Sequence, residues 1–552
     1  MMQSKRKKVI LIGLDGGTFD IIKPYIEEGE MPVLKNLIDT GVHGVLKSTF
    51  PPLTCPAWFS FSTGKNPGKL GMFNFYRLER GSYEIRRFDN HDVDDEKELW
   101  DILNEHGFTT GVFNNPVAYP PKSVNGFMVS GFLAPSTLSD FTRPKSLKAD
   151  LDKVTGGYEI DADQGARFDV KDVVENCHRI LKKRTKAMKF LLSEKNQDFM
   201  MLVYTGTDRM SHQLINLTYS DDKKEAEFAK RELKRFFTAL DSEIGELLKT
   251  LSEEEYTLVI MSDHGFRRRD KGFYLNQWLI NKGYLKLSER VSLLGRTGLT
   301  QKKIASVLEK VGLKNFVRGI VPKALEKRVP VGVIEGEGRP VMDLIQTGGI
   351  DWQNTKAVAI PGGIYINTTD RPEGIVKPED YGALREKLSE ELRNITDPRN
   401  GSRLGVEIFY REEIYKGEFV ENAPDIQFVI GDYEWGEIRN IPPDGRLFDY
   451  LPTAHHDDKG IFIAHGTGIR KNVEIEGANI MDLTPTILAA YGIKPPDDMD
   501  GRVLIEVFED APVFDTEKIE SDDRDITDDS GEYSPEEEKA IEERLRGLGY
   551  VD

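Results

Sequence analysis

The sequence predicts an α/β fold in which a mostly parallel β-sheet is sandwiched between helices. Its apolar, β-prone runs are short and are separated by helical stretches, which is typical of parallel strands joined by crossover helices. These runs are continuously apolar rather than alternating, as expected for strands that are buried on both faces. The chain has 552 residues, of which 39% are hydrophobic, so it is long enough to bury a large core.

The predicted elements follow one another in this alternating order. The strands are expected at residues 9–14, 111–113, 127–129, 199–204, 256–261 and 461–464. The clearest helix is expected at about 223–251, where an apolar stripe recurs at helical spacing: Phe228, Leu233, Phe236, Phe237, Leu240, Ile244 and Leu248. In a sheet of this kind, ligands bind where strands end and loops begin.

The amino terminus superficially resembles a signal peptide, because basic residues precede a short apolar run. However, the run at 9–14 is interrupted by Gly13, ends at Asp15 and is not followed by a small-residue cleavage site. We interpret it as a buried first strand. No run reaches the roughly 18 apolar residues that a membrane span needs, so the expectation is a soluble, cytoplasmic protein.

Charge and cysteine usage exclude several classes of protein. The 75 basic and 93 acidic residues give a net charge of −18, which disfavours a general nucleic-acid binder. The two cysteines, Cys55 and Cys177, are too few for a disulfide framework or a thiolate-rich zinc or iron–sulfur site.

Two segments depart from this background. Residues 282–330 contain twelve Lys/Arg and three Glu, within an insertion predicted at 282–344. This segment is interpreted as a solvated helical insertion, with a lid that attracts an anionic substrate or contacts an anionic membrane as the alternative. Residues 509–538 contain fourteen acidic residues and two basic ones, and we interpret them as part of a flexible acidic linker at 506–533.

The remaining residues are divided between a discontinuous core, 1–281 and 345–505, and a C-terminal helix at 534–552. Ser534 is the predicted N-cap, with Pro535 in the first turn, Glu537 completing a capping box and Gly547 near the end. Three apolar residues of this helix are expected to dock onto the body or onto a second subunit: Ile541, Leu545 and Leu548. The oligomeric state stays open.

Candidate chemical residues lie in five separate segments, each where an apolar run ends. Asp15 lies in ILIGLDGG, and Thr54 lies in PPLTCPAW, whose prolines argue against regular helix. Asp208 and His212 in YTGTDRMSH share one face if the segment is helical, and LVIMSDHGF places Asp263 beside His264. The fifth segment, AHHDDKGIFIAHG, contains three histidines: His455, His456 and His465.

Any one of these residues can be explained as a helix cap, a turn residue or an ordinary core histidine. Together they are better explained as a site, because all are predicted near the carboxyl ends of strands, and five of the nine histidines fall in these segments. Mixed Asp/His ligation without thiolates suits zinc, with manganese as the alternative.

With these motifs in this order, the chain resembles the alkaline phosphatase superfamily, and most of all its type I phosphodiesterase/nucleotide pyrophosphatase-like branch of predicted phosphohydrolases or phosphomutases. The resemblance extends from about residue 9 to residue 504, and the segment DLTPTILAAYGIKPPDDMDGR at 482–502 is similar to that superfamily's end-of-domain segment. The set of motifs is specific, although no single motif is.

The resemblance implies two divalent metal ions that share a phosphoryl group. One ion would be held by Asp15, Thr54, Asp263 and His264. The other would be held by Asp208, His212 and one histidine of the pair 455–456. His456 is preferred because the family's usual spacing puts the ligand four residues before the glycine of GIFIA, whereas His465 is expected to be structural.

The resemblance further implies that Thr54 is the nucleophile and forms a phosphothreonine intermediate. Asn74 lies close to where related diesterases keep a phosphate-binding asparagine, although its spacing is one residue short, and a loop-stabilising amide is the alternative. Cys55 beside Thr54 departs from the family pattern and is interpreted as a packed small side chain.

The expected function is therefore a two-metal phosphoric-ester hydrolase that acts on a small-molecule phosphoester. A phosphomutase with the same site is the first alternative, and a non-catalytic scaffold of the same fold is the second. A sulfatase is disfavoured because Cys55 is followed immediately by Pro56 and the arginine of the sulfatase motif is missing. No motif in the basic insertion indicates whether the substrate contains a base, a sugar or a lipid.

Overall fold

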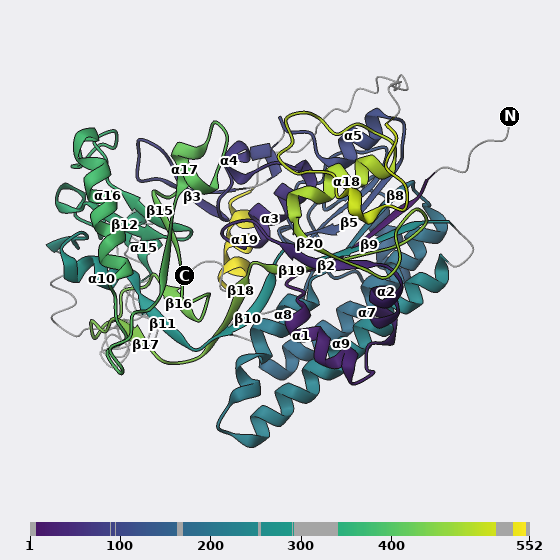
Figure 1. Cartoon of the computed structure of the whole chain (residues 1–552), viewed down its shortest axis with the longest axis horizontal. Helices are drawn as coiled ribbons and strands as arrows, with labels where there is room; N and C mark the ends of the chain where they lie inside the picture. Colours follow the sequence, from purple (N-terminus) through teal and green to yellow (C-terminus); the bar gives the residue numbers. More distant parts are fainter. Residues whose placement is uncertain are drawn as a thin grey trace, which may run out of the picture. The chain divides into compact units, whose positions relative to one another are not determined.

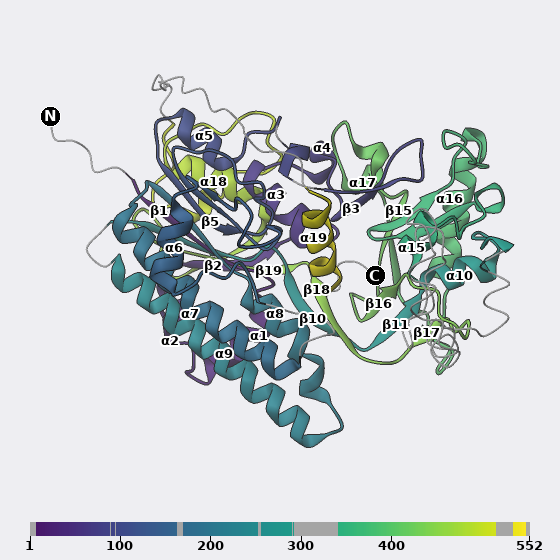
Figure 2. The ribbon, with the colours of Figure 1, turned by 180° about the vertical axis from the view of Figure 1, so that it is seen from behind.

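The structure is a computed structural model that describes residues 7–88, 90–93, 95–162, 169–251, 255–289, 291, 340–514 and 534–547. The chain divides into two compact units, shown in Figures 1 and 2. The first comprises 1–75, 88–268 and 454–551, and the second comprises 76–87 and 269–453.

A nine-stranded sheet forms the centre of the first unit, as far as the described residues show (Figure 1). Its strands, in spatial order, are β20 (Val473–Asn479), β2 (Val42–Lys47), β19 (Lys459–Gly466), β9 (Thr257–Met261), β1 (Val9–Leu14), β8 (Phe199–Tyr204), β5 (Thr110–Asn115), β6 (Gly126–Ser130) and β7 (Thr142–Arg143). Within this sheet β19 and β7 run against the direction that the other strands share. The predicted fold class, a mostly parallel sheet, is confirmed.

Helices cover both faces of this sheet, as Figures 1 and 2 show. One layer contains α1 (Phe19–Glu27), α2 (Pro32–Thr40), α7 (Val170–Glu194), α8 (Gly206–Leu214) and α9 (Lys223–Thr250). The other contains α3 (Thr54–Thr63), α5 (Leu99–Glu105) and α18 (Leu483–Ala490). Every residue of β1 and β8 is buried, which explains their uninterrupted apolar sequences.

The longest described helix, α9, agrees with the predicted one. Asp222 begins it, and its carboxylate accepts a hydrogen bond from the N–H of Lys224. Phe236, Leu240 and Ile244 are fully buried at four-residue spacing, so burial of this stripe stabilises the helix against its neighbours.

The second unit has its own sheets and its own hydrophobic core. The strands β12 (Ala357–Ile360), β13 (Gly363–Ile366), β15 (Ile426–Ile430) and β14 (Val406–Tyr410) form an antiparallel sheet in that order. Strand β11 (Lys271–Tyr274) lies between β16 (Trp435–Ile438) and β17 (Phe448–Asp449). The helices α10 (Leu275–Lys282), α15 (Val341–Gln346) and α16 (Pro378–Arg393) belong to this unit.

This division differs from the one expected from sequence, in which the core resumed at residue 345. Residues 345–453 belong to the second unit, because β12, β13, β14 and β15 pair among themselves, and β16 and β17 pair with β11, instead of joining the nine-stranded sheet. Most of the predicted basic insertion, residues 292–339, lies outside the described residues.

The chain's C-terminal part differs from the predicted bounds at one point. The expected linker begins at residue 506, yet Glu509 N–H still donates to the carbonyl of Gly468, so the chain stays attached to the first unit beyond that point. Residues 515–533 lie outside the described residues. Helix α19 (Pro535–Gly547) then has the predicted capping box, in which Ser534 and Glu537 each bond the other's backbone N–H.

Helix α19 docks onto the first unit. Ile541 and Leu545 are fully buried, and Arg544 donates hydrogen bonds to the carbonyl oxygens of Phe132, Ala134 and Pro135. Leu548 lies outside the described residues. In the described ranges, no helix combines the length and the apolar character that crossing a membrane requires.

Candidate metal centre

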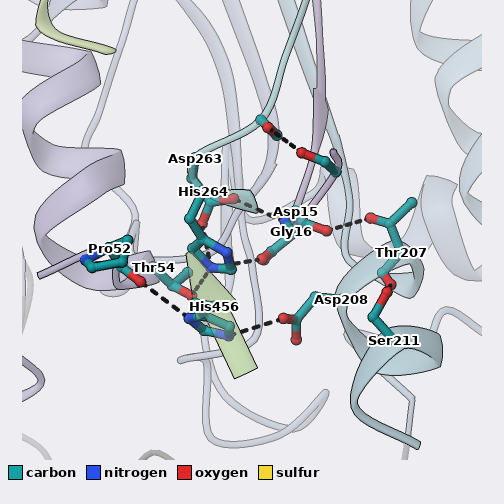
Figure 3. Close-up of polar contacts among 12 residues, drawn as sticks. Asp15, Gly16, Pro52, Thr54, Thr207, Asp208, Ser211, Asp263, His264 and His456 are labelled. Atoms are coloured by element: carbon teal, nitrogen blue, oxygen red, sulfur yellow. Dashed lines mark hydrogen bonds and ion pairs between the residues drawn. The ribbon is translucent and has the colours of Figure 1, made fainter. Parts of the chain in front are cut away.

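Three candidate carboxylates lie at the end of the nine-stranded sheet where its parallel strands β1, β8 and β9 end together. The register places Leu14 of β1 beside Tyr204 of β8, and Gly13 beside Met261 of β9. Asp15, Asp208 and Asp263 follow these three strands within a few residues. Their carboxylates therefore meet at the carboxyl ends of β1, β8 and β9, as expected for an α/β sheet (Figure 3).

Asp15, Asp263 and His264 form the first group. Nε2 of His264 lies 3.2 Å from Oδ2 of Asp263 and 3.7 Å from Oδ1 of Asp15. The backbone N–H of Gly16 donates to Oδ1 of Asp263 at 3.1 Å, which fixes that carboxylate. All three side chains are fully buried, and together they could hold a metal ion.

Asp208, His264 and His456 form the second group, with His212 beside it. Oδ1 of Asp208 lies 3.1 Å from Nε2 of His456 and 3.3 Å from Nε2 of His212. Both Asp208 and His212 lie on α8, so the helix that the sequence left conditional is present and puts them on one face. The imidazole rings of His264 and His456 stack at 3.6 Å, so His264 is common to both groups.

The structure separates the histidines of the fifth segment. His456 lies on β18 (Thr453–Asp457), is fully buried and belongs to the second group, and its Nδ1 lies 3.3 Å from the carbonyl of Pro52. Nδ1 of His455 instead accepts a hydrogen bond from the N–H of His456. His465 pairs with Leu258 near the beginning of β9, at the other end of that strand from Asp263.

Thr54 lies directly beside the first group. Its Oγ1 is 3.2 Å from Nε2 of His264, and the side chain is fully buried (Figure 3). The expectation that this segment is not regular helix is wrong, because Thr54 is the first residue of α3. Pro56 is accommodated because N–H groups in the first turn of a helix have no partner within the helix.

Asn74 is not placed in either group. It is buried, and its side-chain oxygen accepts a hydrogen bond from the adjacent N–H of Phe75 at 2.7 Å. That contact is the local one expected of a loop-stabilising amide. The role of Asn74 at a phosphate stays a prediction.

Arg209 also contacts the second group, although no sequence motif pointed to it. Its guanidinium is fully buried, bonds Oδ2 of Asp208, and lies 2.8 Å from Oδ2 of Asp161. It also lies 5.0 Å from the ring centroid of Phe132. Its position directly after Asp208 was visible in the sequence, but its burial and its second partner, Asp161, depend on long-range packing.

The carboxyl groups of the two groups differ in their electrostatics. Burial, followed by repulsion from Asp263 and Asp208, raises the pKa of Asp15 well above its usual range. Burial raises the pKa of Asp263 to about 7. Burial acts in the same direction on Asp208, but interactions with His212, His456 and Arg209 outweigh it and hold the pKa of Asp208 well below its usual value.

The two buried imidazoles are held neutral. Burial lowers the pKa of His264 to about 4, and burial together with the neighbouring His264 lowers the pKa of His456 to about 3. Neutral imidazole is the form that binds metal ions.

These residues fit a divalent cation. Both carboxylate oxygens of Asp15 are buried without a hydrogen-bond partner, which is costly for a carboxylate unless a cation compensates it. Nε2 of His212 lies 3.1 Å from Nε2 of His456, so the two rings direct nitrogen atoms at each other. Carboxylate oxygens and imidazole nitrogens are ligands typical of zinc, with manganese also compatible.

Comparison with known proteins gives the following matches. A family model described as type I phosphodiesterase / nucleotide pyrophosphatase matches residues 9–442. No curated protein sequence matches the chain. Among solved structures, human ectonucleotide pyrophosphatase/phosphodiesterase 5 is similar at 15% identity and a TM-score of 0.48, over 90% of this chain and 97% of that chain. An inactive variant of the murine protein in complex with AMP matches at 13% identity and a TM-score of 0.47, over 89% and 96%.

Proposed function

The chain belongs to the type I phosphodiesterase/nucleotide pyrophosphatase family, and on that premise we propose that it hydrolyses a phosphodiester or pyrophosphate-type bond of a small molecule through a phosphothreonine intermediate on Thr54. The observation that carries this proposal is the 3.2 Å approach of Thr54 Oγ1 to Nε2 of His264. His264 is the residue that the two candidate metal groups share, so the hydroxyl lies where both could act on it.

Asp15, Thr54, Asp263 and His264 would hold one divalent ion, and Asp208, His212 and His456 would hold the other. Such ions supply Lewis-acid stabilisation of phosphate oxygens and favour the ionised form of a serine or threonine hydroxyl. The chain itself supplies a buried and rigid frame for this chemistry. The N–H of Gly16 orients Asp263, and Arg209 orients Asp208.

The reaction proceeds in two displacements. Oγ1 of Thr54 attacks phosphorus, its hydroxyl proton passes to solvent, and the bond from phosphorus to the leaving oxygen breaks while that oxygen takes up a proton. Water then attacks phosphorus, the bond to Oγ1 of Thr54 breaks, and the hydroxyl is restored as the phosphate product leaves. Because Thr54 begins the ten-residue helix α3, the phosphorylated side chain would lie at the positive end of the helix dipole.

Substitution of Thr54 tests this proposal. We expect Thr54→Ala to lower kcat on bis-p-nitrophenyl phosphate by at least about 10³-fold, because the nucleophile is removed, and Thr54→Ser to retain measurable turnover. The exposed Thr40, whose hydroxyl bonds the carbonyl of Asn36, provides the control Thr40→Ala, which should leave kcat unchanged. Metal content should be measured in each variant, so that loss of metal is distinguished from loss of the nucleophile.

An active Thr54→Ala protein would contradict the assignment of the nucleophile. Failure of the metal-loaded wild-type protein to release p-nitrophenol from either the diester or p-nitrophenyl phosphate would instead favour transfer of the phosphoryl group back to the substrate, as in a phosphomutase.

A further inference from the structure

We propose that Arg268 and Tyr219 form a subsite that binds a second phosphate group of the substrate, beside the phosphoester that Thr54 attacks. This inference rests on the proposed function and narrows its substrate class. The natural substrate would then be a small phosphoester that carries another phosphate on the part of the molecule nearest His212.

The exposure of the candidate ligands indicates the direction from which a substrate reaches the site. The side chains of Asp208, Asp263, His264 and His456 are 0% exposed, and Thr54 is equally buried. The side chain of His212 is 15% exposed. Among the candidate ligands, His212 is therefore the one in contact with solvent, and a substrate must approach along its side.

Phe266 and Arg268 border this approach. The ring of His212 packs edge-on against Phe266, with ring centroids 4.7 Å apart. Phe266 lies on β10 (Gly265–Arg269), which continues directly from His264. Side chains alternate along a strand, so Arg268 lies on the same side as Phe266 and about 7 Å further from the site.

The contact of Arg267 supports this alternation. Nε of Arg267 lies 3.9 Å from Oδ2 of Asp457, which follows His456 on the paired strand β18. Because alternate residues point to opposite faces, Arg267 is directed away from the face that Phe266 and Arg268 share. Arg267 and Arg268 therefore have the same side chain but point to opposite faces of β10.

Arg268 stacks on an aromatic ring. Its guanidinium lies over the ring of Tyr219, 4.1 Å from the centroid. Tyr219 ends the 3-10 helix η2 (Asn216–Tyr219), which follows α8, the helix that carries His212. Tyr219 is 63% exposed, so solvent and a dissolved ligand reach this pair.

This arrangement suits a phosphate. Stacking on an aromatic ring uses the flat face of the guanidinium, whereas its N–H donors lie in the plane of the group and match the oxygens of a phosphate. The ring limits the rotation of the arginine side chain, which lowers the entropy lost when a ligand binds. A phosphate several bonds from the reacting phosphorus would fit the strand spacing between Phe266 and Arg268.

Two p-nitrophenyl diesters that differ only in their second phosphate test the proposal: p-nitrophenyl 3-phosphopropyl phosphate and p-nitrophenyl 3-hydroxypropyl phosphate. We expect the wild-type enzyme to prefer the phosphorylated ester, and Arg268→Gln to lower kcat/KM for that ester by about tenfold, mainly through KM, without affecting the hydroxypropyl ester. Arg268→Lys should recover part of the preference because it restores the charge. Arg267→Gln is the matched control and should leave the preference intact.

The outcomes separate this proposal from the proposed function. If the hydroxypropyl ester is cleaved but the preference is absent, or is lost equally in Arg267→Gln, the subsite is refuted while the hydrolase stands. If neither ester is cleaved, the proposed function fails. In that case, calorimetry of 1,3-propanediol bisphosphate binding tests the subsite by itself. The affinity must be lower for Arg268→Gln than for the wild type and unchanged for Arg267→Gln. Equal affinity of the two variants would refute the subsite.

Discussion

Three buried carboxylates at one sheet edge have different protonation behaviour because their neighbours differ. Asp208 contacts His212, His456 and Arg209, and these contacts lower its pKa. Burial raises the pKa values of both Asp15 and Asp263, and the charge of Asp263 adds to the effect on Asp15. In the absence of a cation, this part of the site destabilises the folded chain whenever both carboxylates are ionised.

The pH dependence of the metal-stripped protein should therefore change when Asp263 is replaced. The folded protein holds the Asp263 proton up to about pH 7, whereas the unfolded chain releases it near pH 4. Stability is present below the unfolded pKa and is lost as pH rises through this window, because the unfolded state gains free energy from deprotonation first. We expect Asp263→Asn to raise the free energy of unfolding at pH 8 by on the order of 1–3 kcal/mol and to have little effect at pH 4.

Urea unfolding of the metal-stripped wild type and variant at both pH values measures this difference. Comparing variant with wild type also isolates Asp263 from His264 and His456, whose lowered pKa values give the opposite slope, with stability lost as pH falls. Asp161→Asn is the contrasting control. Burial opposes ionisation of Asp161, but Arg209 and Arg184 still lower its pKa, so removing its charge should destabilise the protein at pH 8. A loss of stability in Asp263→Asn at pH 8 would contradict the interpretation.

At the scale of elements, helix α19 is held to the first unit chiefly through one arginine and two apolar residues. Arg544 donates to three carbonyl oxygens in the loop at 132–135, and the ring of Phe132 in that loop lies under the guanidinium of Arg209. Glu537 completes the docking, because it accepts hydrogen bonds from Ser139 and Tyr119. The C-terminal helix thus supports a loop that contacts a partner of Asp208.

Replacing Arg544 should release this helix locally. We expect Arg544→Ala to accelerate amide hydrogen exchange in residues 535–547 by about tenfold or more, because charge-assisted hydrogen bonds of about 1.5–3 kcal/mol are lost. Arg470→Ala is a matched control, since Arg470 also donates to a backbone carbonyl, that of Phe508. It should leave exchange in α19 unchanged, and unchanged exchange in Arg544→Ala would show that Ile541, Leu545 and Glu537 suffice for docking.

At the scale of the whole molecule, the cluster joins segments from residue 15 to residue 456, so a cation bound there links strands, α8 and β18. Ligands that bind only the folded state stabilise it by mass action. We expect zinc or manganese at about 100 times its Kd to raise the free energy of unfolding of the stripped protein by about 2.7 kcal/mol for each site.

Thermal unfolding in a chelator, and again after adding each metal, measures this gain. Equilibrium dialysis should give about two ions per chain, the number of candidate groups. His456→Ala should lose most of the gain from one site, whereas His465→Ala should keep it, because His465 lies on β19 beside the beginning of β9, away from the cluster. A stripped protein whose thermal unfolding does not respond to either metal would contradict the assignment of the cluster.

The sequence by itself determined the fold class, the candidate ligand types and their order along the chain. These follow from local features: continuous apolar runs mark strands buried on both faces, and polar residues directly after such runs mark their ends. The capping box of α19 is equally local, so its start was predictable from Ser534 and Glu537.

The tertiary structure alone decided what Arg209 contacts, where the chain divides into two units, and how His456, which the family spacing already favoured, reaches Asp208. The strand β18 turns His456 into the cluster and leaves His455 beside it, because alternate residues of a strand face opposite sides. These features depend on which distant strands pair and in what register, and neither can be inferred from the residues of a single strand.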